Sequence, residues 1–167
     1  MSRLVLVAGL NIALILLVCR WAGIRVNVTS SAPIGLYRTV DASVERGDLV
    51  EACLPAAAAR LATTRGYLLA HGACGDSMPV IKHVLALEGD EIRVSDHVHL
   101  NGVVIDTAPV LDVDLGGRPL EPAAGGTLGT DQVWLISDEI AHSYDSRYFG
   151  PISRSAIRSV MRPLWTV

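Results

Sequence analysis

The sequence predicts a mainly β domain that follows one apolar N-terminal helix. Short apolar runs bounded by Gly, Pro, Asn and Asp recur along most of the chain, and this punctuation is typical of strands. Asn101-Gly102 separates two of these runs and is a strong signal for a type I′ hairpin turn. A chain of 167 residues is long enough for one domain with a substantial core, and a second independent domain is not expected.

The first element is the apolar stretch over residues 4–24. Its length reaches the roughly 20 residues that a helix needs to cross a bilayer, so we expect residues 1–25 to form a retained transmembrane anchor. A cleaved signal peptide is the alternative, but the residues around Cys19 form no small-x-small cleavage site. Arg3 precedes the stretch and two arginines lie at its other end, so charge alone leaves the orientation of the anchor open.

Residues 26–167 are expected to fold as one domain. A helix is expected at residues 55–65, because a proline opens this alanine-rich run and Gly66 follows it. The glycines and prolines of residues 107–130 indicate an irregular excursion, so we expect a small hairpin and irregular subdomain over about residues 91–132. Strands are expected at residues 47–52 and 80–87, in a hairpin over residues 91–105, and at residues 132–137.

Charge and histidine content exclude two classes of function. The net charge of −3 and the pI near 5.9 do not provide the broad basic surface on which non-specific nucleic-acid binding relies, so we expect no nucleic-acid partner. His97 and His99 alternate on an expected strand and face one way. Two histidines without further ligands are more often surface residues, and no Cys/His metal spacing is present, so we expect no metal site.

Of the three cysteines, only Cys53 and Cys74 lie in the soluble part of the chain. If this part is exported, a disulfide between them would close a loop that contains the expected helix, and a loop of that size typically contributes about 3 kcal/mol. The alternative is that both are unpaired small apolar residues. The sequence leaves the choice between these two states open.

Two stretches contain side chains that could work together as nucleophile and base. Thr29, Ser30 and Ser31 directly precede Ala32-Pro33-Ile34-Gly35-Leu36-Tyr37, where Pro and Gly hold a hydroxyl at a bend, although this segment alone could be an ordinary turn. Lys82 lies within an apolar run, where burial disfavours the ammonium form and lets the amine accept a proton from a serine. An edge-strand lysine that prevents aggregation is the simpler interpretation of Lys82 alone.

A third stretch adds charged residues. Asp145 and Arg147 follow the last expected strand and could orient the lysine, or could form a structural ion pair. His142, Asp145 and a serine also allow a Ser-His-Asp hypothesis. We disfavour it because Lys82 has the better desolvated surroundings and nothing else marks His142 as a base.

Together these stretches resemble the sequence boxes of the type I signal peptidase superfamily. The quoted motifs are Asn27-x-Thr29-x-Ser31-x-Pro33-x-Gly35-x-Tyr37, Lys82 with Gly89-Asp90 after it, and Asp145-Ser146-Arg147-Tyr148-Phe149-Gly150-Pro151. They are most similar to the conjugative-transfer branch, the TraF-type prepilin peptidases, in which cysteines also tend to follow the first strand and precede the lysine. The resemblance runs from the anchor to Pro151.

The resemblance implies a signal-peptidase-like β catalytic domain without a metal or organic cofactor. It implies Ser31 as nucleophile, Lys82 as general base and Asp145 as third residue. Three further residues would support them: Thr29 at the oxyanion hole, with Ser143 and Arg147 beside the base. We expect the substrate to add as a strand along the segments 28–31 and 78–81, so that the substrate groove includes Val28, Met78 and Val80.

Two positions depart from the ordinary signal peptidases. Their nucleophile precedes Pro by three positions, which would select Ser30, whereas the conjugative pattern selects Ser31. His83 stands where arginine is usual after the lysine. The run Asp76-Ser77-Met78-Pro79 is similar to their nucleophile box, but it lies so near Lys82 along the chain that we expect it to line the groove.

The resemblance also implies a location and partners. We expect a single-pass protein of the bacterial inner membrane with its amino terminus inside and its catalytic domain in the periplasm. The expected substrate is a pilin precursor or another exported protein, processed through an acyl-enzyme that water or the pilin's own amino terminus resolves, in association with the conjugation machinery. The alternatives are a housekeeping signal peptidase and a non-catalytic anchored scaffold for pilus assembly.

Overall fold

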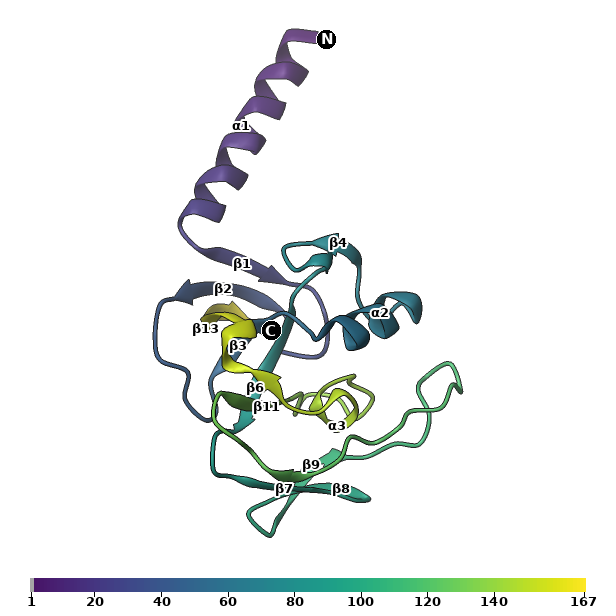
Figure 1. Cartoon of the computed structure of the whole chain (residues 1–167). Helices are drawn as coiled ribbons and strands as arrows, with labels where there is room; N and C mark the ends of the chain where they lie inside the picture. Colours follow the sequence, from purple (N-terminus) through teal and green to yellow (C-terminus); the bar gives the residue numbers. More distant parts are fainter. Residues whose placement is uncertain (1) are drawn as a thin grey trace.

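The computed structural model describes residues 2–167 (Figure 1). The chain begins with helix α1 (Ser2–Trp21), which extends away from the rest of the molecule in Figure 1. Among the helices of the described residues, none is both long and apolar enough to cross a membrane. The transmembrane span therefore stays a prediction.

The largest element of the domain is a seven-stranded antiparallel sheet, so the prediction of a mainly β fold is confirmed. Its strand order is β1-β2-β13-β3-β6-β11-β12, which places β6 between β3 and β11. The strands are β1 (Ile24–Asn27), β2 (Gly35–Val40), β3 (Leu49–Ala52), β6 (Val80–Ala86), β11 (Gln132–Ile136), β12 (Ile152–Ser153) and β13 (Ile157–Thr166).

A four-stranded sheet with the order β10-β7-β8-β9 covers one end of this domain. Asn101 and Gly102 join β8 to β9 with φ angles of 51° and 82°, as a type I′ turn requires, so the predicted turn is confirmed. The expected hairpin is however split, because Ser95 and Asp96 form an additional turn after β7. The strands are β7 (Glu91–Val94), β8 (His97–Leu100), β9 (Val103–Pro109) and β10 (Gly126–Thr127).

The helices of the domain are short. α2 (Ala56–Thr64) matches the predicted helix within a residue at each end, and it is followed by the small hairpin of β4 (Ala70–Gly72) and β5 (Gly75–Ser77). α3 (Ser146–Phe149) and a 3₁₀ turn (Arg154–Ala156) precede the last strand. The strands β1, β2 and β13 are not among those predicted from the sequence. Pro163 obscures β13, and the sheet accommodates it at a shift of register between Pro163 and Trp165.

Two apolar cores hold β6 and β11 in place. One core packs residues of the four-stranded sheet, among them Ile92 and Val98, against Ala86 of β6 and Trp134 and Ile136 of β11. The second core lies within the large sheet and includes Val84 and Leu135. Because neighbouring positions of β6 and β11 face different cores, neither strand can shift without disturbing both.

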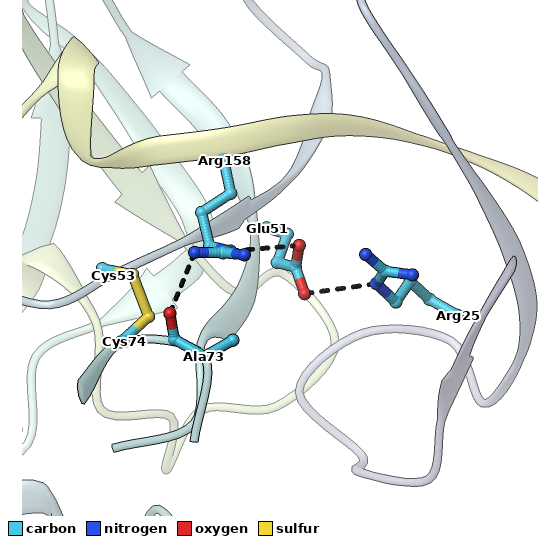
Figure 2. Close-up of a disulfide and its surroundings, with 6 residues drawn as sticks. All are labelled: Arg25, Glu51, Cys53, Ala73, Cys74 and Arg158. Atoms are coloured by element: carbon cyan, nitrogen blue, oxygen red, sulfur yellow. Dashed lines mark hydrogen bonds and ion pairs between the residues drawn. A yellow bond between two sulfur atoms is a disulfide. The ribbon is translucent and has the colours of Figure 1, made fainter. Parts of the chain in front are cut away.

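A disulfide joins Cys53 to Cys74, with the two Cα atoms 5.5 Å apart, so the paired alternative is confirmed (Figure 2). It closes a loop over residues 53–74 that contains α2 and β4, and β5 begins directly after it. Glu51, which is buried on β3, forms ion pairs of 3.6 Å with both Arg25 and Arg158, and Arg158 also donates to the carbonyl of Ala73. These contacts connect the disulfide segment to three strands of the large sheet.

Replacing both cysteines tests the contribution of this link. We expect Cys53→Ser/Cys74→Ser to lower the free energy of unfolding by about 3 kcal/mol, because the unfolded chain regains the freedom of a closed loop. Urea unfolding of the purified protein measures the change. Cys19→Ser is the matched control and should leave the midpoint unchanged. Equal stability of the double variant and the wild type would contradict a stabilising role.

Candidate active site

The loop between β1 and β2 carries the predicted nucleophile and is shaped by Asn27. The buried Asn27 amide donates to the carbonyls of Thr29, Ala32 and Pro33 at 2.9, 2.9 and 3.1 Å, and its Oδ1 accepts from the backbone N–H of Thr29. The hydroxyl of Tyr37 donates to the carbonyl of Pro33 as well. Both ends of the loop are therefore fixed by side chains from its own hairpin.

Gly35 of this motif lies where β2 and β13 approach each other too closely for a side chain. A Cβ at this position would lie 2.1 Å from the carbonyl oxygen of Trp165 on β13, a distance that no side chain tolerates. Gly35 also pairs with Asn27 across the β1–β2 hairpin. The absence of a side chain at Gly35 thus allows β13 to pair with β2 at the end of the strand that adjoins the loop.

The three hydroxyl residues of the loop have different surroundings. Ser30 is exposed, whereas Ser31 is half-buried and its carbonyl accepts a hydrogen bond of 2.7 Å from the Ser137 hydroxyl. Thr29 donates its hydroxyl hydrogen to Asn27 Oδ1 at 2.8 Å. In this arrangement Thr29 has no proton left for an oxyanion, so the predicted role would require its hydroxyl to rotate.

Lys82 is the only lysine of the chain; every other residue among the 14 Lys and Arg is an arginine. It lies on β6 opposite Val50 of β3, and its side chain is 3% exposed. Leu135 pairs with Val84 and Ile136 with His83, so continuing this register by one residue places Ser137 opposite Lys82. Directly opposed residues have Cβ atoms about 5 Å apart.

Burial lowers the pKa of the Lys82 ammonium from 10.5 to about 8. The negative charge of Asp145 opposes this change and the positive charge of Arg147 adds to it. Among the described residues, Lys82 makes no hydrogen bond or ion pair that would hold the ammonium form. At pH 7 a pKa of about 8 leaves roughly a tenth of the amine neutral, several hundred times more than in a free lysine.

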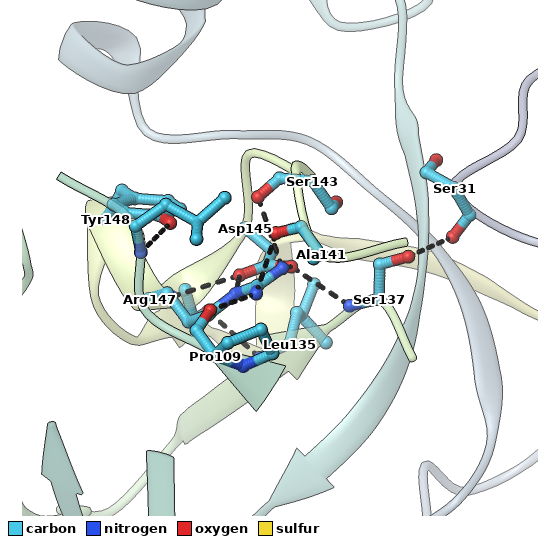
Figure 3. A network of polar contacts seen from close by, with 11 residues as sticks. Ser31, Pro109, Leu135, Ser137, Ala141, Ser143, Asp145, Arg147 and Tyr148 are labelled. Carbon is cyan, nitrogen blue, oxygen red and sulfur yellow. Dashed lines mark hydrogen bonds and ion pairs between the residues drawn. The ribbon is translucent and has the colours of Figure 1, made fainter. Parts of the chain in front are cut away.

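Asp145 and Arg147 form a fully buried ion pair (Figure 3). Arg147 Nε and Nη2 donate to the two carboxylate oxygens of Asp145 at 2.8 Å each. The remaining guanidinium hydrogens reach the carbonyls of Pro109, Ala141 and Ser143. Asp145 Oδ2 also accepts from the backbone N–H of Ser137, at 3.0 Å. The carboxylate therefore acts on the lysine through its charge, while its bonds fix the end of β11.

The other predicted residues lie around this arrangement. The Ser143 hydroxyl is buried and, within residues 2–167, has no hydrogen-bond partner. Val28 and Met78 are exposed, and Val80 is half-buried at the start of β6. These three side chains are expected to line the groove, and the exposure of the first two leaves them available to a substrate.

The Ser-His-Asp alternative from the sequence lacks support in the geometry. His142 is exposed, and Asp145, its supposed partner, is occupied by Arg147 and Ser137. The run over residues 76–79 is expected to line the groove, but Ser77 within it is only 1% exposed, so this side chain is not accessible to a substrate. No sequence pattern indicates Ser137, because its contact with Ser31 joins residues 106 positions apart. One signal for the site is visible in the sequence, namely that Lys82 is the sole lysine.

Comparison with known proteins gives consistent matches. A family described as "Signal peptidase, peptidase S26" matches residues 1–165. A plasmid transfer protein TraF of Escherichia coli is 43% identical over 150 residues, which cover 87% of this chain and 84% of the relative. A conjugal transfer protein TraF of Agrobacterium tumefaciens is 40% identical over 147 residues, covering 86% and 83%.

Among solved structures, a signal peptidase I from Enterococcus faecalis V583 is similar with a TM-score of 0.44. It is 18% identical, and the match covers 74% of this chain and 100% of that chain.

The buried ion pair predicts a large loss of stability on substitution of its acid. Asp145→Asn should lower the free energy of unfolding by about 3 kcal/mol or more, because it leaves the buried Arg147 charge uncompensated. Urea unfolding measures the effect. Asp138→Asn is the matched control, since this exposed carboxylate forms one ion pair among the described residues, with His83 at 3.7 Å. This variant should change stability by less than roughly 0.5 kcal/mol. Equal effects of both variants would contradict the assignment.

Proposed function

We propose a serine/lysine peptidase activity for this chain, which belongs to the signal peptidase family S26 and, within it, to the group of the TraF conjugal transfer proteins. The observation that carries the proposal is the environment of Lys82. The sole lysine of the chain is buried and has a pKa of about 8. The register of β6 and β11, extended by one residue, sets it opposite Ser137, which donates to the carbonyl of Ser31. An amine of this kind can deprotonate a serine near neutral pH.

We assign the nucleophile to Ser31 rather than Ser30. The support is that Ser31 is half-buried and bonded to Ser137, whereas Ser30 is exposed. A nucleophile must be held within reach of its base, and a residue fixed to the strand beside Lys82 meets this requirement better than one at the tip of the loop.

In the proposed reaction, neutral Lys82 accepts the hydroxyl proton of Ser31 as Ser31 Oγ attacks the scissile carbonyl of the substrate. The backbone N–H of Ser31 donates to the developing oxyanion. When the peptide bond breaks, the proton passes from Lys82 to the departing amine, leaving Ser31 acylated. A second nucleophile then releases the acyl group: water gives hydrolysis, and the amino terminus of the same product gives a ring.

We further propose that the substrate is an exported pilin precursor and that residues 1–25 anchor the enzyme in the inner membrane, with the catalytic domain in the periplasm. The relatives' function in conjugal transfer supports the substrate. The disulfide between Cys53 and Cys74 supports an oxidising compartment, since such bonds are rare in the cytosol. Asp145, with Arg147 and Ser143, acts as support for the lysine and not as a group that touches substrate.

Processing of a cognate pilin precursor in membranes tests the dyad. Ser31→Ala and Lys82→Met should each reduce the rate at least about a thousandfold, because each removes a group that forms or breaks a bond. Ser30→Ala is the matched control and should remain active. The intact mass of the product distinguishes hydrolysis from cyclisation, since a ring is lighter by one water. Unchanged processing by all three variants would overturn the peptidase assignment and favour an anchored scaffold.

The pH dependence tests the base independently. Only neutral Lys82 accepts the proton, so kcat/KM should rise about tenfold per pH unit up to about pH 8 and level off above it. A peptide substrate that spans the cleavage site measures this profile, with the thermal midpoint followed over the same range to exclude unfolding. A profile without this limb, or with a limb near the pKa of an ordinary lysine, would argue against Lys82 as the base.

A further inference from the structure

We infer that Ser137 is a positioning residue for the nucleophile, an inference that rests on the proposed activity of Ser31. The Ser137 hydroxyl donates to the carbonyl oxygen of Ser31 at 2.7 Å, and Figure 3 shows this bond reaching from the end of β11 to the loop between β1 and β2. Within the described part of the chain, it is the one hydrogen bond that ties Ser31 itself to another element.

The donor is rigidly held. Ser137 is fully buried, and its backbone N–H donates to Asp145 Oδ2. Asp145 is fixed in turn by the two bonds from Arg147. A continuous series of hydrogen bonds therefore runs from the buried guanidinium to the peptide group of the nucleophile, and every member before Ser31 is excluded from solvent.

The loop needs such a contact because its other bonds leave Ser31 free. Asn27 fixes the carbonyls of Thr29, Ala32 and Pro33, but in the described part of the chain it forms no hydrogen bond with Ser31 or Ser30. Without Ser137, the peptide of Ser31 could rotate between the fixed carbonyls of Thr29 and Ala32 and displace the Ser31 side chain. A misplacement of about 1 Å can cost a hundredfold in rate, so one hydrogen bond at this point has a large effect on catalysis.

The position of Ser137 opposite Lys82 allows a second role that must be distinguished. The hydroxyl has one hydrogen, and it is donated to Ser31, so Ser137 cannot also donate to the neutral amine. Its lone pairs could still accept from the ammonium form, which would raise the pKa of Lys82. A positioning role predicts that removal of the hydroxyl leaves the acid limb of the pH profile in place, whereas a role in ionisation predicts that the limb moves.

Ser137→Ala tests the inference with two readouts. Hydrogen exchange of a peptide covering residues 28–33 should become faster, since the loop has lost its contact with β11. On the peptide substrate, kcat should fall by about tenfold to a hundredfold, which is the order of the rate lost when a nucleophile is misplaced. KM should stay within about twofold of the wild-type value. The pH midpoint of the acid limb should equal that of the wild type within error. Ser137→Gly, which also lacks the hydroxyl, should behave in the same way.

Ser159→Ala is the matched control, because the Ser159 hydroxyl is buried on β13 of the large sheet and finds no hydrogen-bond partner among residues 2–167. This variant should match the wild type in both readouts. Unchanged exchange and kcat in Ser137→Ala would overturn the inference, as would faster exchange with unchanged kcat. A shifted acid limb would assign Ser137 to Lys82 instead of Ser31. If the wild type fails to process any substrate, the proposed function has failed, and the exchange readout still decides whether the hydroxyl holds the loop.

Discussion

Burying the side chain of Lys82 opposes folding, because an ammonium group loses its hydration and gains no hydrogen bond from the described residues. A pKa lowered from 10.5 to about 8 corresponds to about 3 kcal/mol of lost stability in the charged form. Because the folded-state pKa is below the unfolded one, this cost is present in full below pH 8 and disappears as the pH rises toward 10.5. The domain must supply enough stability elsewhere to keep the lysine where its amine is reactive.

The elements around β6 supply that stability. Two apolar cores clamp β6 and β11 from different sides, and the buried pair of Asp145 and Arg147 fixes the end of β11 beside the lysine. The disulfide and the contacts of Glu51 tie the segment that precedes β6 to the large sheet. The negative charge of Asp145 also limits how far burial lowers the pKa of Lys82. The pKa therefore remains near the pH at which a general base is effective.

Local patterns predicted the elements that local chemistry determines. The apolar run around Lys82 indicated a buried strand, Asn101-Gly102 indicated a turn, and the alanine-rich run indicated α2; the structure contains all of them. The sequence could not predict β13, since its pairing with both β2 and β3 depends on contacts across the whole chain. For the same reason it missed Ser137, which meets Ser31 only after β11 has joined β6. The sequence could not decide whether Cys53 and Cys74 are paired, because a disulfide requires two Cα atoms to lie close together and spacing along the chain does not show this.

Direct titration of Lys82 tests the central claim that burial makes its amine available as a base. Because the chain has no other lysine, protein labelled with ¹³C at the lysine Cε gives a single side-chain signal, and its chemical shift can be followed by NMR from pH 6 to 11. The account predicts a midpoint near pH 8 in the folded protein and a return to the ordinary lysine value in urea. A folded-state midpoint at or above 10 would mean that Lys82 is charged at physiological pH and would contradict the account.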